Sequence, residues 1–268
     1  MLEPLPAIEP RLAAPDRFAR NLPAGAALQW LAAGWADLRD GPAQSLTYGL
    51  AVFALSACVI LGLMRAGLPW LIFPSLSGFL VIGPLLAIGL YEKSRRRHSE
   101  APATFTQMLL VRPASGGQLV FAGLLSCLLV VLWLRAADLL YALFFGMLPF
   151  PGFDQILAQL LTTPRGWALI LTGSAVGGLF AAFAMAISLF SIPMLLERRV
   201  DALTSLGTSF AITAQNLRAV LPWGLIVTLG FALSAATGLL GLIVIFPLLG
   251  HGTWHAWIAL RPSYSCGT

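Results

Sequence analysis

The chain has 268 residues, of which 58% are hydrophobic and 10% are charged, and its formal net charge is +5. A soluble domain carries about a quarter charged residues to cover its surface, so this composition, with a mean hydropathy of +0.85, excludes an ordinary soluble protein. The positive charge does not indicate nucleic-acid binding, because the basic residues lie at the ends of long apolar runs, where membrane orientation requires them.

Five long runs of the chain contain no Asp, Glu, Lys or Arg. A bilayer core about 30 Å thick needs about 20 helical residues to cross it, so four runs hold one crossing each and the last, between Arg218 and Arg261, holds two. The apolar residues are continuous rather than alternating, which favours helices over a barrel. The sequence therefore predicts an all-α membrane bundle with transmembrane helices at 45–64, 70–91, 118–141, 168–195, 219–237 and 239–260.

The two ends of the chain are predicted to be cytoplasmic tails, 1–25 and 261–268, flanking a single transmembrane domain at 26–260. Residues 1–25 are rich in Pro and Ala and lack the compact apolar core of a cleavable signal peptide. Of the 16 Lys and Arg residues, 13 fall on one side of the predicted helices, and Arg65 and Arg165 fall on the other. The positive-inside rule then places both termini in the cytoplasm.

Amphipathic stretches precede each pair of predicted helices, at 26–38, 101–112 and 201–218, with apolar residues at helical spacing. We expect them to lie in the inner membrane interface, so that the chain consists of three units, each an interfacial helix followed by a membrane hairpin. Each even-numbered helix also carries a proline near its inner end: Pro84, Pro193 and Pro247. Such an internal repeat occurs in transporters but also arises by duplication in inert scaffolds, so both interpretations remain open.

The segment 142–165 contains the sequence Pro-Phe-Pro-Gly and Asp154, which oppose a continuous seventh crossing. A seventh crossing would also place Arg198 and Arg199 outside. We therefore expect an outer loop with a short interfacial helix that is opened by Asp154 and stopped by Pro164.

Three motifs carry a resemblance to a known family: GPLLAIGLYEKSRRR, TTPRGWALILTGSAVGG and FPLLGHGTWHAW. Together they resemble an uncharacterised bacterial family of six-helix integral membrane proteins, a domain of unknown function, from about Trp30 to Trp257. The resemblance implies a bacterial cytoplasmic (inner) membrane location and no established activity. The chain departs from the family after TWH, where AWIAL replaces the usual basic residues before Arg261.

A metal or haem site is one interpretation of the pair His251 and His255, which share a helix face at a separation of four residues. If the three prolines mark equivalent positions, Glu92 and Glu197 join the two histidines near one cytoplasmic mouth, and such a set suits a divalent metal. The alternative is structural, with these groups at helix ends paired to nearby Arg or lipid headgroups. The histidine pair lacks the general-base Glu of a zinc protease motif.

Arg135 and Asp138 are the only opposite charges within one predicted span, and their separation of three residues lets them pair. Charged residues in a span suggest an ion pathway. The alternative is snorkelling, because Arg135 lies about 25 Å along its helix, close to the outer surface.

Small residues and aromatic residues give two packing predictions. Overlapping small-xxx-small patterns in the fourth helix predict close helix packing there, at Gly173, Ser174, Gly177 and Gly178. Aromatic residues near the helix ends are expected to act as interfacial anchors: Trp30, Trp70, Tyr91, Trp167, Trp223, Trp254 and Trp257. The basic run 93–98 is expected to fix orientation and to contact anionic lipid headgroups.

No nucleotide-binding loop, nucleophile elbow or zinc protease motif is present in the sequence, which favours a non-enzymatic protein. The first functional hypothesis is a non-enzymatic accessory, assembly or scaffold component that packs against other membrane proteins, without a cofactor. Another membrane protein complex is the partner that this hypothesis expects, and a homo-oligomer is the alternative. A small-solute transporter or channel is the second. A metal- or haem-binding protein that uses the HGTWH motif is the third.

Overall fold

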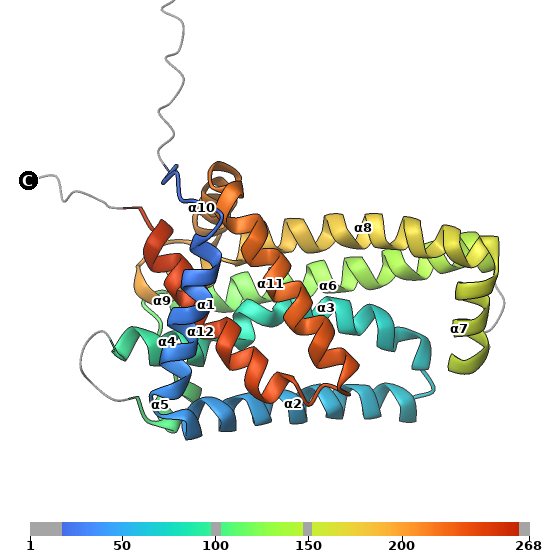
Figure 1. The fold of residues 1–268 in the computed structure, drawn as a ribbon, viewed down its shortest axis with the longest axis horizontal. Helices are drawn as coiled ribbons and strands as arrows, with labels where there is room; N and C mark the ends of the chain where they lie inside the picture. Colours follow the sequence, from blue (N-terminus) through green and yellow to red (C-terminus); the bar gives the residue numbers. More distant parts are fainter. Residues whose placement is uncertain (1–17, 98–102, 147–151, 263–268) are drawn as a thin grey trace, which may run out of the picture.

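In the computed structural model of the chain, residues 18–97, 103–146 and 152–262 are described, and they form helices without any strand (Figure 1). Most of the two predicted tails, the start of the stretch 101–112 and residues 147–151 of the predicted loop lie outside these ranges. The helices are α1 (Ala26–Arg39), α2 (Pro42–Arg65), the 3-10 helix η1 (Pro69–Leu71), α3 (Ile72–Leu86), α4 (Ile88–Arg97), α5 (Phe105–Leu109), α6 (Gly116–Phe145), α7 (Phe153–Thr162), α8 (Pro164–Ser188), α9 (Ser191–Glu197), α10 (Ala202–Gln215), α11 (Leu217–Ala236) and α12 (Leu242–Leu260).

Six helical segments of the described chain are long and apolar enough to cross a membrane, which is the number predicted from the charge-free runs. They are Pro42–Arg65, Pro69–Arg97, Gly116–Phe145, Pro164–Glu197, Leu217–Ala236 and Leu242–Leu260. The second segment ends at Arg97 and the fourth at Glu197, both later than predicted, because the short helices α4 and α9 follow α3 and α8. Most residues of α4 and α9 are buried by protein.

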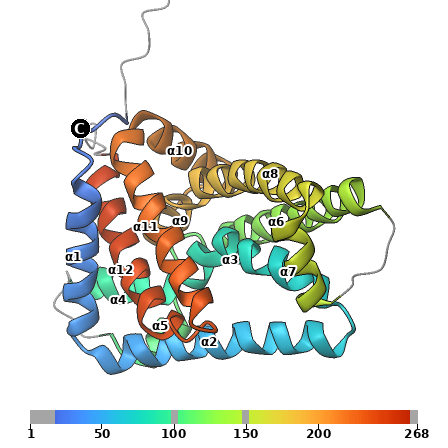
Figure 2. The ribbon, with the colours of Figure 1, turned by 45° about the vertical axis from the view of Figure 1, so that its right-hand side comes forward.

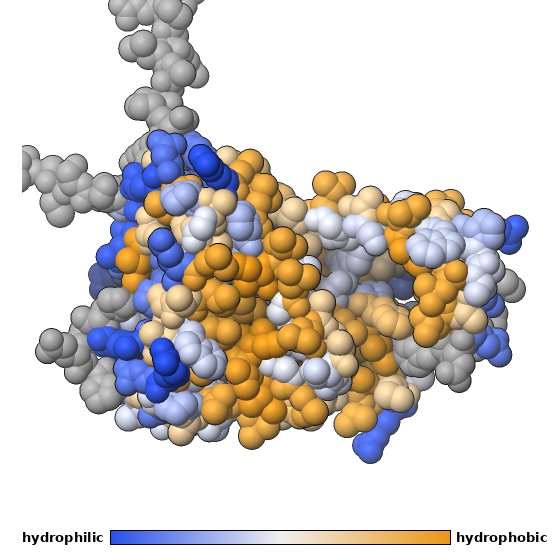
Figure 3. Space-filling model, in the orientation of Figure 1, coloured by the Kyte–Doolittle hydropathy of each residue, from blue (hydrophilic) through white to orange (hydrophobic). Residues whose placement is uncertain are grey.

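The two ends of the bundle differ in polarity (Figure 3). We call the end that holds Arg95–Arg97, Arg198 and Arg261 the polar end, and the end that holds Arg65 and Arg165 the far end. Helices α2, α3, α6 and α8 run lengthwise between them, whereas α1 crosses the polar end and packs against α12 (Figures 1 and 2). The described chain begins and ends at the polar end (Figure 1).

The three prolines used to define a repeat have different surroundings. Pro84 lies within the last turn of α3, before a break at Ala87, and Pro193 lies in the short helix α9 that follows the break after α8. Helix α12 continues without a break through Pro247. The helix is therefore interrupted near two of the prolines and is continuous at the third.

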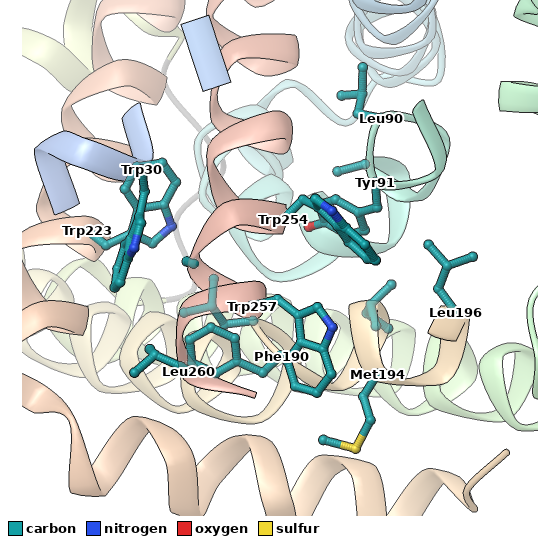
Figure 4. Close-up of a cluster of buried hydrophobic side chains, with 14 of the residues drawn as sticks. Trp30, Leu90, Tyr91, Phe190, Met194, Leu196, Trp223, Trp254, Trp257 and Leu260 are labelled. Atoms are coloured by element: carbon teal, nitrogen blue, oxygen red, sulfur yellow. The ribbon is translucent and has the colours of Figure 1, made fainter. Parts of the chain in front are cut away.

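Aromatic side chains form the core at the polar end (Figure 4). Trp30 packs edge-on against Trp223 with ring centroids 6.0 Å apart, Tyr91 stacks on Trp254 at 6.5 Å, and Trp257 lies 6.5 Å from Phe190. All of these are buried, so the prediction of interfacial anchors is wrong for five of its seven residues: Trp30, Tyr91, Trp223, Trp254 and Trp257. These five side chains lie near helix ends, as predicted, but α1, α4 and α9 cover those ends and separate the side chains from the lipid surface.

Glycines allow these helices to approach closely. A Cβ on Gly34 of α1 would lie 2.6 Å from the backbone nitrogen of Gly252 in α12, and one on Gly49 of α2 would lie 2.3 Å from the carbonyl oxygen of Ile243. Real Cβ atoms do not approach backbone so closely, so both crossings depend on the absence of a side chain. Helix α12 is thereby held between α1 and α2.

The small residues of α8 pack less closely than predicted. Only at Gly177 would a Cβ meet a neighbouring helix, 2.8 Å from the ring of Trp133 in α6, whereas Gly173 and Gly178 have open space at that position. Ser174 and Gly178 are exposed. Of the four small residues, Gly178 lines a cleft that is described below, and Gly177 makes the helix contact.

A short helix, α7, stands in the predicted outer loop and ends just before Pro164. Pro164 begins α8, and the Thr163 hydroxyl accepts a hydrogen bond from the Gly166 backbone nitrogen at 3.0 Å. A Cβ on Gly166 would lie 2.3 Å from the carbonyl oxygen of Gln159, so α7 folds back tightly on the start of α8.

Candidate functional site: a buried polar network at the polar end

Polar side chains from four helices meet inside the polar end, where α1 ends, α2 begins, and α4 and α12 pass. The close crossing of α1 and α12 at Gly34 brings the last turn of α1 to the middle of α12. We call the group that meets there the Asp37–His251 network: Asp37, Ser45, Lys93, Ser94, Arg97, His251 and His255.

Asp37 is the acidic centre of the network and is only 2% exposed. Its carboxylate accepts hydrogen bonds from the Ser94 hydroxyl at 2.6 Å and from His255 Nε2 at 2.9 Å, and it also pairs with Arg97. Burial alone would raise the pKa of Asp37, but the hydrogen bonds from His255 and Ser94 and the charge of His255 outweigh it and lower the pKa to about 2. The carboxylate therefore stays ionised within the protein.

His251 is fully buried and both of its ring nitrogens are engaged. Nδ1 lies 2.8 Å from the Ser94 hydroxyl and Nε2 lies 2.9 Å from the Ser45 hydroxyl. The Ser94 hydroxyl donates its only hydrogen to Asp37, so it must accept from Nδ1, and Nε2 of the neutral ring accepts from Ser45. These partners assign the Nδ1–H tautomer.

Lys93 completes the network on the side of α2. Its Nζ donates to the Ser45 hydroxyl at 2.7 Å, to the Gly41 carbonyl at 2.8 Å and to the Asp37 carbonyl at 3.3 Å. The ammonium group therefore lies at the carboxyl end of α1, where the helix dipole favours a cation. Hydrogen bonds run in one direction from Lys93 through Ser45, His251 and Ser94 to Asp37.

This arrangement joins α1, α2, α4 and α12 by side chains whose polar groups are satisfied by one another. A satisfied buried network fixes the register of the helices that carry it, whereas the loss of one member leaves its partners unpaired in a low-dielectric interior. His251 has no exposed surface with which to contact a substrate. The geometry supports a structural role that holds the polar end together.

The four residues considered for a metal have separate partners. Glu92 forms ion pairs with Arg95 at 2.7 Å and Arg96 at 2.6 Å on its own helix, and Glu197 accepts a hydrogen bond from Trp257 Nε1 at 2.8 Å and pairs with Arg261. His251 is held by serines and His255 by Asp37. Across the described ranges, no group of three or more His, Cys, Asp or Glu side chains is placed to hold a metal ion.

Arg135 and Asp138 form the pair that their spacing predicts, with 3.4 Å between Nη1 and Oδ2. The Arg135 side chain is 66% exposed, so the pair lies on the outer surface of α6. This position is that expected for snorkelling and is unlike that of a charge lining an internal pathway.

The comparison with known proteins concerns the middle of the chain. Residues 72–197 match DUF2189, a family described as predicted integral membrane protein. The resemblance to a family of unknown function is thus confirmed over this segment, which is shorter than the stretch from Trp30 to Trp257 expected from the motifs. No curated protein and no solved structure matches the chain.

The DUF2189 segment includes Lys93, Ser94 and Arg97 of the network, whereas Asp37 and His251 lie outside it on either side. Sequence reasoning assigned Lys93 to a lipid-facing basic cluster and did not single out Asp37. A signal was present in α1, where Asp37 follows Trp30 and Gly34 at helical spacing and so shares their buried face.

A cleft of about 420 Å³ lies next to the network, between α3, α8, α11 and α12. The surface is hollowed between α8 and α11, where the small residues Gly178, Ala181 and Ala182 of the DUF2189 segment leave space (Figure 3). Of the four hydroxyl side chains in the lining, Thr228 and Ser234 donate to carbonyl oxygens of their own helix, and Tyr91 and Thr253 bond to each other. The cleft therefore presents an almost entirely apolar surface to its contents.

Proposed function

We propose that this chain is a non-enzymatic accessory or assembly component that packs against another membrane protein through the far end of α6, α7 and α8. The observation that carries this proposal is the length of α6. Its 30 residues extend about 45 Å, whereas the bilayer core is about 30 Å thick. Helix α2 ends at Arg65 after 24 residues, about 36 Å, so the α6–α8 pair extends further (Figures 1 and 2).

The position of Arg135 supports the view that this extra length lies beyond the hydrocarbon. Arg135 lies about 28 Å along α6 from Gly116, close to the thickness of the core. The ten residues that follow continue the helix by about 15 Å. Beyond that level the surface still carries large exposed apolar side chains: Leu139, Leu143, Leu157, Leu161, Trp167 and Leu171.

An apolar surface of this kind outside the hydrocarbon is a site of protein contact, because water leaves it when a partner covers it. We call it the far-end apolar surface. It has contributions from three helices, and α7 is fixed against α8 at Gly166, so the surface is already formed before a partner arrives. A partner with its own apolar side chains at the same level fits it.

A photo-crosslinking amino acid tests this proposal when it replaces Leu143 or, as a matched control, Leu128. Both are exposed leucines of α6, 74% and 64% exposed, but Leu128 lies within the length that spans the core. We expect crosslinks from position 143 to a second protein of defined mass in native membranes, and none from position 128. Crosslinks only to another copy of this chain, or equal crosslinking from both positions, would contradict the proposal.

A second candidate, a transporter for a small solute, is supported by the cleft between α3, α8, α11 and α12. The lining favours an apolar solute, because most of its side chains are apolar and the hydroxyls of Thr228 and Ser234 are already bonded to backbone. Replacement of Ala182 by Phe fills the cleft and should abolish retention of such a molecule during purification. Unchanged retention in this variant would exclude the cleft as its site.

The remaining expectations are proposals with direct tests. A cytoplasmic polar end in a bacterial inner membrane is supported by the basic residues gathered there. To test it, an extra lysine is introduced within residues 93–97. A membrane-impermeant amine reagent should fail to label that lysine in intact cells. Metal or haem binding by His251 and His255 predicts metal in elemental analysis or a haem absorption band in the purified protein. A colourless, metal-free, folded sample would end that interpretation.

A further inference from the structure

A basic pocket of about 800 Å³ opens at the polar end, away from the Asp37–His251 network. It lies between the segment before α1, the chain that follows α9, and the end of α12. Four arginines line it, together with apolar side chains at its base: Arg20, Arg198, Arg199, Arg261, Met194 and Ile258.

Backbone contacts fix the arginines from distant parts of the chain around this pocket. The Arg20 guanidinium donates to the Arg261 carbonyl at 3.3 Å, and the Arg198 guanidinium donates to the Pro262 carbonyl at 3.1 Å. The Arg20 backbone is itself held by the Asn216 side chain at 2.9 Å, and the Arg198 guanidinium lies 5.7 Å from the centre of the buried Trp257 ring. The positive charges therefore meet in a preformed arrangement.

The pocket holds more positive charge than its acidic neighbours balance. Glu197 is the nearest carboxylate to the group, and it already accepts from Trp257 and pairs with Arg261. Asp201 accepts a hydrogen bond from the Thr204 backbone nitrogen at 2.8 Å and caps α10. Arg199 is exposed, and within the described ranges it forms no ion pair. Among the described residues, Glu197 pairs with Arg261 and, at 4.0 Å, with Arg198, so the four arginines keep a net positive charge that suits a bound anion.

The surroundings of the pocket place it at the level of lipid headgroups. Its base is supplied by α9 and by the last turn of α12, which are the polar ends of two candidate membrane spans. Helix α10 begins beside the pocket and exposes the apolar side chains of Leu203 and Phe210. A guanidinium group at such a level next to apolar side chains is typical of a site for an anionic lipid headgroup.

We propose that the basic pocket binds the phosphate headgroup of an anionic phospholipid, whose acyl chains lie against the apolar surface beside α10. Guanidinium groups suit this ligand because their planar donors can form two parallel hydrogen bonds with phosphate oxygens. The lipid, rather than free phosphate, is the ligand because the apolar side chains at the base and beside the pocket contact only a molecule that also has acyl chains. This inference is independent of the far-end apolar surface.

Thermal unfolding of the full chain in a neutral detergent tests the proposal. Wild type, Arg199→Gln and Arg218→Gln are each titrated with short-chain phosphatidylglycerol, with phosphatidylcholine of the same chain length, and with inorganic phosphate. Arg218 is the matched control because it is an exposed arginine at the same end that does not line the pocket. Both variants lose the same charge, and both should unfold at the wild-type temperature before lipid is added.

We expect phosphatidylglycerol to stabilise the wild type and Arg218→Gln alike, and to bind Arg199→Gln about fivefold more weakly. Equal weakening in the two variants would overturn the proposal, because it would indicate diffuse attraction between charges and not a pocket. Equal stabilisation by phosphatidylcholine, or by inorganic phosphate alone, would also overturn it. Equal stabilisation by phosphatidylcholine would show that the negative charge of the lipid is not needed. Equal stabilisation by inorganic phosphate would show that the acyl chains are not needed.

Discussion

The polar end and the far end of this bundle are stabilised in different ways. At the polar end, α4, α9 and the second half of α12 are buried almost completely, and aromatic rings, glycine crossings and the Asp37–His251 network join them. At the far end, no residue of α2 after Val52 and no residue of α6 after Trp133 is buried. The same helices therefore depend on protein contacts at one end and on surrounding lipid or a partner at the other.

This difference follows from what drives packing in each place. Water meets the polar end, so burial of Trp, Phe and Leu side chains there removes apolar surface from water. Lipid tails are as apolar as leucine, so the part of α2 in hydrocarbon gains nothing comparable when it packs, and the far-end apolar surface gains burial only when the proposed partner covers it. Substitutions of the same kind should consequently have unequal effects at the two ends.

Matched tryptophan substitutions give the largest expected contrast. Trp257 at the polar end is fully buried and donates to Glu197, whereas Trp167 at the far end is 51% exposed. We expect Trp257→Ala to lower the free energy of unfolding by about 4 kcal/mol, because it leaves a cavity and an unpaired acceptor. Trp167→Ala should cost less than about 1 kcal/mol. Thermal or denaturant unfolding in detergent measures both, and equal losses would contradict the division into two regions.

A pair of glycine substitutions should give a smaller contrast that also tests the small-residue prediction. In Gly34→Ala the new methyl group meets the backbone of Gly252, so we expect a loss of about 3 kcal/mol from strain at the crossing of α1 and α12. In Gly173→Ala the methyl group meets open space, and the better helix propensity of Ala should leave stability unchanged or slightly raised. Unfolding temperatures of the two variants decide whether α1–α12 or α8 is the closely packed contact.

Acid should lower the free energy of unfolding by less than Trp257→Ala or Gly34→Ala does. The pKa of Asp37 is lowered from 3.8 to about 2 in the folded state, so the folded protein binds fewer protons than the unfolded chain between these values. The resulting stabilisation, about 2 kcal/mol, is fully present above pH 4 and is lost as the pH falls from about 4 to about 2.

Asp37→Asn isolates this contribution from that of other carboxylates. The variant should be less stable than the wild type at pH 7, and the difference between the two unfolding free energies should shrink as the pH falls toward 2. A difference that stays constant between pH 5 and pH 2 would show that the ionised carboxylate of Asp37 does not stabilise the polar end.

The spans could be predicted from sequence, and the interior of the polar end could not. Charge-free runs predict spans directly, because their length is set by the thickness of hydrocarbon and needs no knowledge of neighbours. The surroundings of Trp257, His251 and Glu92 depend on contacts with α1 and α9. These helices are distant in the sequence, so local patterns do not reveal that they cover the helix ends. Proline spacing placed Glu92 and Glu197 beside the histidines, but the helix breaks near Pro84 and Pro193 have no counterpart at Pro247, and the four residues have separate partners.

Contact between the first and the last helix of the bundle determines when this fold can be completed during synthesis. Helix α1 is translated well before its partners Gly252 and His255, and His255 lies 218 residues after Asp37. Until α12 has inserted, the glycine face of α1 lacks its contact with Gly252 and Asp37 lacks its hydrogen bond from His255. The contact between α1 and α12 therefore forms only after α12 has been made, and a nascent chain truncated before Gly250 should remain sensitive to proteases at α1.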